Sequence, residues 1–196
     1  MNKFFSKNNK GFTVVETLVA IAILSLSITA TFTAVQNGIR FSTTAKDQIT
    51  AFYLAQQAVE SIKNKRDNNV LHSLHELSIG NTPSRQWLYG LAQAGTDPCY
   101  FGKVCQIDSL TQTATYCGDA AITSSAPNAC TTNMRQNESN GLYGYNSSWP
   151  LTRFKREVQL ENVVAGREVR VVVTVSWTGN SGTKFFQVRE TLLNRE

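Results

Sequence analysis

The least expected charged side chain in the sequence is the carboxylate of Glu16. It lies in a run from Phe12 to Val35 whose other residues are apolar, small or hydroxyl-bearing. A charged carboxylate in the core of a bilayer costs roughly 2.5–3.5 kcal/mol on insertion scales. In a low dielectric a nearby ammonium group would stabilise this carboxylate. The alternative is that Glu16, the fifth residue of the run, reaches the head-group region and is tolerated there.

A cut between Gly11 and Phe12 would create a suitable ammonium group. The new α-amine would lie about one helical turn from Glu16 in the same chain. Between staggered neighbouring helices, the amine of one chain could pair with the carboxylate of the next. Glu16 would then set the register of an assembly.

Histidines offer a weaker candidate site. His72, His75 and Glu76 form the pattern H-x-x-H-E, and the two histidines could share a helix face. A zinc site needs three or four ligands, and no third ligand follows at a recognisable spacing. We expect surface or interface histidines and no metal site.

The motifs of the common enzyme classes are missing from the sequence. It has no G-x-S-x-G, no phosphate-binding loop and no cysteine near a histidine at a useful spacing. We therefore expect no catalytic residues, no cofactor and no enzymatic activity.

All four cysteines lie between residues 95 and 150: Cys99, Cys105, Cys117 and Cys130. Their spacing matches neither a zinc ribbon nor a redox C-x-x-C, and four cysteines allow three disulfide pairings. If this part of the chain lies outside the cytoplasm, disulfides are the natural outcome. We expect the neighbours to pair, 99 with 105 and 117 with 130, because each bond closes a local loop. Free thiols in a cytosolic domain are the alternative.

The run of residues 12–35 is long enough for a transmembrane helix, which needs about 20 apolar residues. Lys3, Lys7 and Lys10 precede the run without an acidic residue, which places the N-terminus in the cytoplasm and the C-terminal part outside. The run exceeds the usual apolar region of a secretory signal, which favours a retained segment. Without these lysines the net charge falls from +5 to +2, so nucleic-acid binding is not supported.

Helical periodicity continues over residues 36–66 as an amphipathic segment. Its apolar residues recur at spacings of three and four, and Leu54 and Ala58 widen the stripe that they form: Ile39, Phe41, Ala45, Ile49, Phe52, Ala55, Val59 and Ile62. Asp67-Asn68-Asn69 is expected to end the helix, because these residue types favour turns. Residues 67–150 are then a loop-rich region with a short helical piece before Gly80.

Residues 151–196 are expected to form an antiparallel β-meander. Phe154, Arg156, Val158 and Leu160 share one parity of the first strand, and alternate valines from Val169 to Val175 lead to Trp177 in the second. A turn is expected at 162–166, and residues 178–182 form a hairpin loop before the third strand. The sequence predicts an α+β fold in which the long helix covers this small sheet.

The string Lys10-Gly11-Phe12-Thr13, followed by Glu16 and the apolar run, resembles the class III signal of type IV pilins and type II secretion pseudopilins. The resemblance covers residues 3–35. It implies that residues 1–11 are a leader removed after Gly11 by a prepilin peptidase. It also implies that the new N-terminal residue, Phe12, is methylated, and that Glu16 pairs with the N-terminus of an adjacent subunit.

The resemblance also bears on the type of subunit. Many major pilins have a proline late in the apolar run, whereas this chain has Thr33 and no proline before Pro83. Pseudopilins and minor pilins more often lack that proline. The C-terminal V-x-V-x-W strand resembles the sheet of PilV- or GspI-like minor pilins.

Two functions follow as expectations. The first is a structural subunit that partners other pilin or pseudopilin subunits, the prepilin peptidase and an inner-membrane assembly platform. It would be held in the inner membrane as a single-pass protein and then enter a pilus or pseudopilus. The second is an uncleaved single-pass anchor that presents an extracellular binding or adhesion domain.

The substitution Gly11→Val tests the signal. We expect it to block removal of residues 1–11, because the resemblance makes Gly11 the last leader residue. Intact mass of membrane-extracted protein measures the processing, and continued cleavage would contradict the assignment.

Overall fold

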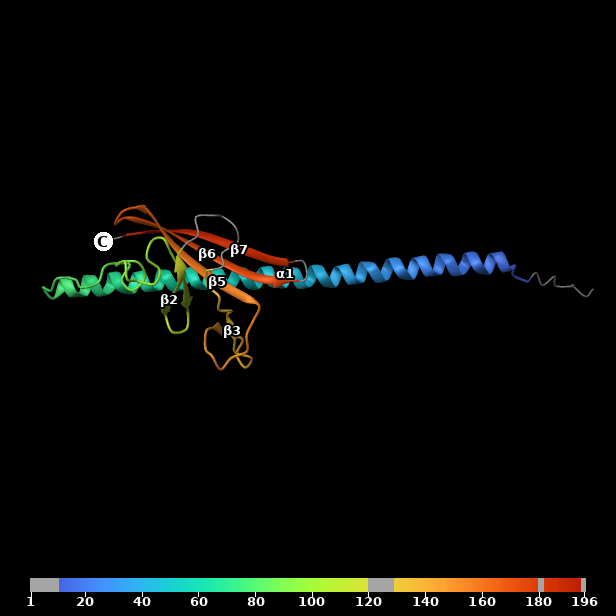
Figure 1. The fold of residues 1–196 in the computed structure, drawn as a ribbon, viewed down its shortest axis with the longest axis horizontal. Coiled ribbons are helices and arrows are strands. Elements are labelled where there is room, and N and C mark those ends of the chain that lie inside the picture. Colours follow the sequence, from blue (N-terminus) through green and yellow to red (C-terminus); the bar gives the residue numbers. More distant parts are fainter. Residues whose placement is uncertain (1–10, 120–128, 180–181, 195–196) are drawn as a thin grey trace, which may run out of the picture. The chain divides into compact units, whose positions relative to one another are not determined.

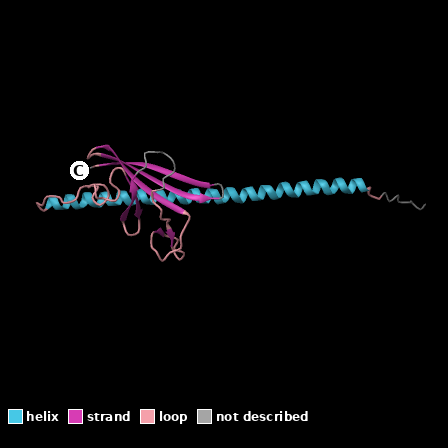
Figure 2. Ribbon diagram, viewed as in Figure 1, coloured by secondary structure: helices cyan, strands magenta, loops and turns pink. Residues whose placement is uncertain are grey.

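The computed structural model describes residues 11–119, 129–179 and 182–194. A helix, α1 (Val14–Ser78), precedes seven strands (Figures 1 and 2). These are β1 (Lys103–Asp108), β2 (Thr113–Asp119), β3 (Arg135–Gln136), β4 (Tyr143–Gly144), β5 (Phe154–Val164), β6 (Glu168–Gly179) and β7 (Gly182–Leu193). The chain divides into two compact units, residues 1–47 and 48–196.

The second unit contains the antiparallel sheet, whose strand order is β2-β1-β5-β6-β7. Strands β5, β6 and β7 pair consecutively, with Val173 opposite both Val158 and Val188. The predicted meander and the α+β class are therefore confirmed. The first turn is shorter than predicted: β5 runs to Val164, and Gly166 adopts a φ of 71°, a conformation that glycine adopts without strain.

The region 67–150, predicted to be rich in loops, also contains regular structure. Strands β1 and β2 form a hairpin that extends the sheet beyond β5, and β3 and β4 pair in a small second sheet. Strand β1 pairs with β5 at two positions, where Val104 lies opposite Gln159 and Cys105 lies opposite Val158. The sequence did not indicate these strands, because β3 and β4 have only two residues each and β2 is mostly exposed, so it lacks an alternating apolar pattern.

Alanines on α1 face the sheet across the core. Ala51, Ala55 and Ala58 are fully buried with Val59 and Ile62, and the sheet contributes Val158, Leu160 and alternate valines of β6. The predicted stripe is therefore buried only in its last part. Ile49, which lies in the same unit as the sheet, is 57% exposed, so the expectation that the helix stripe packs on the sheet holds only from Ala51 onward.

The helix does not end at Asp67-Asn68-Asn69, as predicted, but continues to Ser78. The Asn69 side chain is buried, and its Nδ2 donates to the backbone oxygens of Trp87 (3.2 Å) and Tyr89 (3.0 Å). This amide therefore bonds a distant loop and does not compete for the helix backbone. The actual end is a Schellman motif, in which Asn81 N donates to Glu76 O (2.9 Å) and Gly80 has a φ of 80°.

Disulfides join Cys99 to Cys105 and Cys117 to Cys130, the pairing expected from the sequence. The first ties the segment before β1 to β1 itself. The second ties β2 to the segment that leads to β3. Each bond closes a loop of the chain and so restricts the unfolded state.

A buried arginine links the helix to the sheet. Arg156 on β5 has no exposed surface, and its Nη1 donates to Leu54 O (2.9 Å) and Gln57 Oε1 (3.0 Å) of α1. Its Nη2 donates to Ile107 O and Ser109 Oγ. Burial lowers the pKa of the guanidinium, while nearby Tyr145 and Asp108 oppose that shift. Three parts of the second unit therefore meet at one side chain.

Arg156→Ala should destabilise the protein by about 3 kcal/mol or more, because it leaves a cavity and unpaired acceptors in the core. Urea unfolding of the detergent-solubilised full chain measures the change. Arg189→Ala, on the exposed face of β7, is the control and should change stability by less than about 0.5 kcal/mol. Equal stability of the two variants would contradict the role of Arg156.

The neighbouring residue Glu157 points to the opposite face of β5, where it is 2% exposed. Its Oε1 accepts a hydrogen bond from Cys130 N (2.8 Å), while its Oε2 has no partner among the described residues. Burial raises the pKa of this carboxyl group, although the bond from Cys130 partly offsets the shift. The folded state therefore binds the proton more tightly than the unfolded state does.

It follows that Glu157 costs stability as the pH rises from about 4 through its folded pKa. Glu157→Gln should be more stable than the parent at pH 7, and the difference should close near pH 4. Thermal unfolding at both pH values measures this. The control Glu161→Gln, at an exposed ion pair with Arg170 (3.1 Å), should show little change. A parent more stable than Glu157→Gln at pH 7 would contradict the prediction.

Candidate functional site

The residues around the expected cleavage position lie outside the helix. Gly11, Phe12 and Thr13 precede α1, and Phe12 is 81% exposed. Thr13 is the N-cap: its Oγ1 accepts a hydrogen bond from Glu16 N (3.2 Å), and its carbonyl accepts one from Thr17 N (3.2 Å). The Gly11–Phe12 peptide bond is therefore accessible and is not held by helical hydrogen bonds.

Nothing among the residues that the structure describes requires glycine at position 11. A Cβ atom added there would meet no atom within 4 Å among the described residues, and the backbone does not have a positive φ. A requirement for glycine at this position would therefore come from an enzyme that binds the segment. Gly11→Val tests recognition by that enzyme without disturbing the fold.

Glu16 is the third residue of α1, where the positive end of the helix dipole favours a carboxylate. Its side chain is exposed. Within the described part of the chain, no hydrogen bond or ion pair reaches its carboxylate. A cation that neutralises Glu16 in an apolar medium must therefore come from the segment before Gly11, from a newly made N-terminus or from another molecule.

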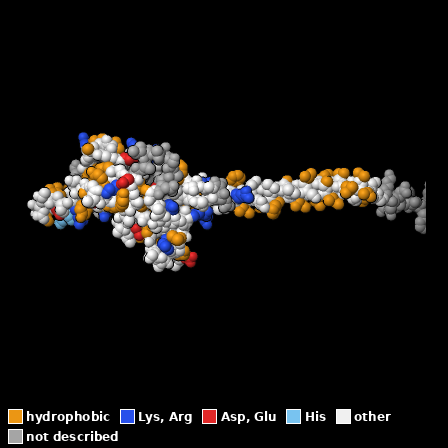
Figure 3. Space-filling model, in the orientation of Figure 1, with side chains coloured by type: hydrophobic (Ala, Val, Ile, Leu, Met, Phe, Trp, Pro, Cys, Tyr) orange, Lys and Arg blue, Asp and Glu red, His pale blue; other side chains and the backbone are white. Residues whose placement is uncertain are grey.

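The apolar helical segment that follows Glu16 is not covered by any of the described residues. Its large apolar side chains from Val14 to Val35 are 53–77% exposed, and Figure 3 shows hydrophobic side chains along this segment. By length and composition, α1 contains a segment that could cross a membrane, and none of that segment is buried. Its surface therefore requires lipid or another protein.

Four hydroxyl groups in this segment form hydrogen bonds within the helix. Ser27, Thr29, Thr31 and Thr33 each donate to the carbonyl four residues earlier, at 2.8–3.1 Å. Such bonds need no water, so they make these residues compatible with a bilayer or a dry bundle.

The candidate histidine site has a different arrangement. His72 Nδ1 lies 3.6 Å from Glu76 Oε2, and that carboxylate also accepts hydrogen bonds from Ser84 N (2.7 Å) and Ser84 Oγ. The hydrogen bond from the Ser84 backbone lowers the pKa of Glu76. Glu76 therefore holds the segment after the helix. Across residues 11–119, 129–179 and 182–194, no three potential metal ligands cluster.

Arg156 is the residue that sequence reasoning did not single out. The signal was present, since Arg156 shares the parity of the apolar residues Phe154 and Val158. A charged residue on the apolar parity indicates a buried polar contact, but its partners on α1 and β1 lie about 100 and 50 residues away.

Comparison with protein families gives one match: the model described as the prokaryotic N-terminal methylation motif matches residues 6–32. The chain thus carries a type IV pilin-like class III signal, and the matched residues include Gly11, Phe12 and Glu16. Comparisons with curated proteins and with solved structures give no match. The motif indicates a pilin-like protein that is processed by a prepilin peptidase and anchored in a membrane.

Proposed function

We propose that this protein is a minor pilin or pseudopilin, a structural subunit of a type IV pilus or of a type II secretion-like pseudopilus. The observation that carries the proposal is the arrangement at the start of α1. A methylation motif leads directly into the uncovered apolar run of residues 12–35, whose only charge, Glu16, has no partner in the described chain.

The proposed sequence of events begins with insertion in the inner membrane, N-terminus in the cytoplasm. The peptidase hydrolyses the accessible bond after Gly11, and the new amine of Phe12 is methylated. At the assembly platform, the helix leaves the lipid and joins a bundle of similar helices. Apolar packing replaces lipid contacts, and the satisfied hydroxyl groups of the helix can make this transfer without loss of their hydrogen bonds.

In that bundle Glu16 sets the register. A lone carboxylate among apolar helices is unfavourable, and an amine of an adjacent subunit relieves the cost only at one stagger. A specific stagger is what a regular fibre requires. Glu16 therefore sets the stagger between adjacent subunits as well as strengthening their association.

The assignment to a minor pilin or pseudopilin rests on the helix itself. No proline interrupts α1 between Val14 and Ser78, whereas many major pilins contain one. The disulfides between Cys99 and Cys105 and between Cys117 and Cys130 support an extracytoplasmic location of the second unit.

One experiment separates this proposal from an uncleaved membrane anchor. In cells with a working prepilin peptidase, mass analysis of the N-terminal peptide should find N-methyl-Phe12, and the protein should appear in the sheared fibre fraction. Glu16→Ala should remain in the membrane and be processed, but its share in fibres should fall about tenfold or more, because the register pair is lost.

Retention of residues 1–11 in the parent protein would refute the proposal. Normal incorporation of Glu16→Ala would remove the register role but leave processing intact. A suitable control is Glu60→Ala, which removes an exposed carboxylate from the same helix and should incorporate like the parent.

A further inference from the structure

The last turns of α1 have their polar and apolar residues reversed. Asn69 and Ser73 are each 4% exposed, whereas Leu71, Leu74 and Leu77 are 64%, 52% and 56% exposed. Ile79, just after the helix, is 58% exposed. Buried polar groups beside large exposed apolar ones are the reverse of the usual pattern, and this arrangement calls for an explanation.

The buried side is explained within the chain. Asn69 and Ser73 lie seven and eleven residues after Ile62, which keeps them on the helix face that packs on the sheet. There the neighbour is the loop of Trp87 and Tyr89, which presents carbonyl groups, and Asn69 donates to both. A polar residue is therefore required on the inner face at this level.

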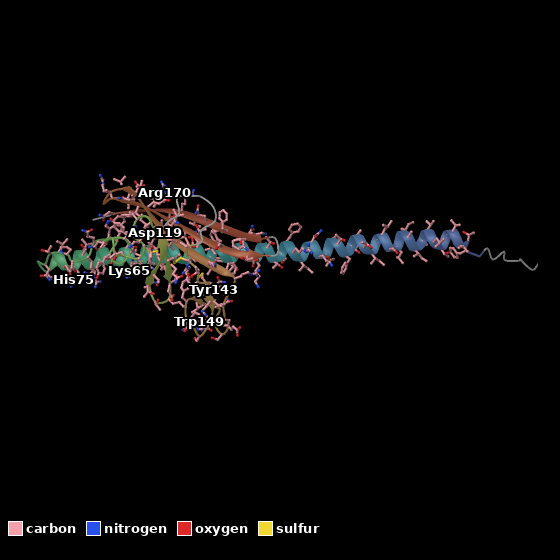
Figure 4. The ribbon with its side chains drawn as sticks, viewed as in Figure 1. Lys65, His75, Asp119, Tyr143, Trp149 and Arg170 are labelled. Atoms are coloured by element: carbon pink, nitrogen blue, oxygen red, sulfur yellow. A yellow bond between two sulfur atoms is a disulfide. The ribbon has the colours of Figure 1, made fainter. Side chains whose placement is uncertain are left out.

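The outer side has no such explanation within the described residues. Leu71, Leu74 and Leu77 recur every third residue and form a ridge, here called the leucine ridge. His75, which follows Leu74 in the sequence, is labelled in Figure 4 and marks this end of α1. Solubility would favour polar residues at these positions, so the ridge indicates a surface that is covered in the assembled protein.

The spacing and the exposed area of the leucine ridge limit the kinds of partner that could bind it. A ridge with a spacing of three fits between the rows of side chains of a second helix at about 20° from parallel. With Ile79 it exposes a few hundred Å², below the roughly 800 Å² per partner of a stable complex. A partner held nearby by another contact could use so small a surface, because its effective concentration is high.

Lipid of the bilayer that holds the apolar run is a poor candidate. The ridge begins some 36 residues after Val35, whereas about 20 helical residues span a bilayer. We propose that the leucine ridge packs against a nearly parallel helix of a neighbouring pilin-type subunit. This inference rests on the proposed function and adds a second intersubunit contact to the one at Glu16.

The test uses the full-length protein in cells that assemble the fibre. Leu71→Glu/Leu74→Glu should be processed to Phe12 and keep both disulfides, yet its share in the sheared fibre fraction should fall about tenfold or more, because buried leucines become charged. Asn68→Glu, an exposed polar position of the same helix, should fall less than about twofold.

A photo-crosslinking side chain at position 74 identifies the partner. A crosslink to a pilin-type subunit, this protein included, supports the inference. A crosslink to lipid or to another class of protein, no crosslink, or full incorporation of the double variant overturns it. In these cases the parent still enters the fibre with N-methyl-Phe12. Absence of the parent from fibres would instead refute the proposed function, and the inference with it.

Discussion

The apolar run of α1 is exposed throughout in the part of the chain that the structure describes, and this uncovered hydrophobic surface constrains the molecule. From Ala51 to Ile62 the sheet buries one face of the helix. From Val14 to Val35 the side chains are uncovered on every side. Because a helix satisfies its own backbone hydrogen bonds, such a segment can exchange lipid for protein neighbours without unpaired polar groups. A helix that is stored in a membrane and then packed in a fibre needs this property.

In the second unit, buried polar side chains fix how α1 lies against the sheet and the loops. Alanines bring the sheet close to α1, and the guanidinium of Arg156 reaches backbone and side-chain acceptors of both the helix and β1. Asn69 holds the 87–89 loop in a similar way. Apolar burial supplies most of the stabilisation, whereas these directional bonds specify where the helix lies against the sheet and the loops.

Under the proposed function, the charge of Glu16 at the start of the helix is balanced by a covalent change followed by assembly. In the described chain Glu16 has an N-terminal helical position but no partner. Removal of the leader would supply an amine, and assembly would bring that amine to a neighbouring carboxylate. Under the proposed function, the signal, the exposed Gly11–Phe12 bond and the register of the fibre are therefore parts of one device.

The sequence by itself determined the features that depend on local pattern: the apolar helix, the class III signal and the alternation of β5 to β7. Neighbour pairing of the cysteines was expected among three possible pairings, and the structure decided it. Only the tertiary structure decided that α1 continues past Asp67-Asn68-Asn69, because the tendency of Asn69 to form turns is overridden by carbonyl groups about 20 residues away. The same holds for the buried Arg156 and for the exposed Ile49. Propensity and periodicity describe a segment alone, whereas burial depends on which distant segment lies opposite it.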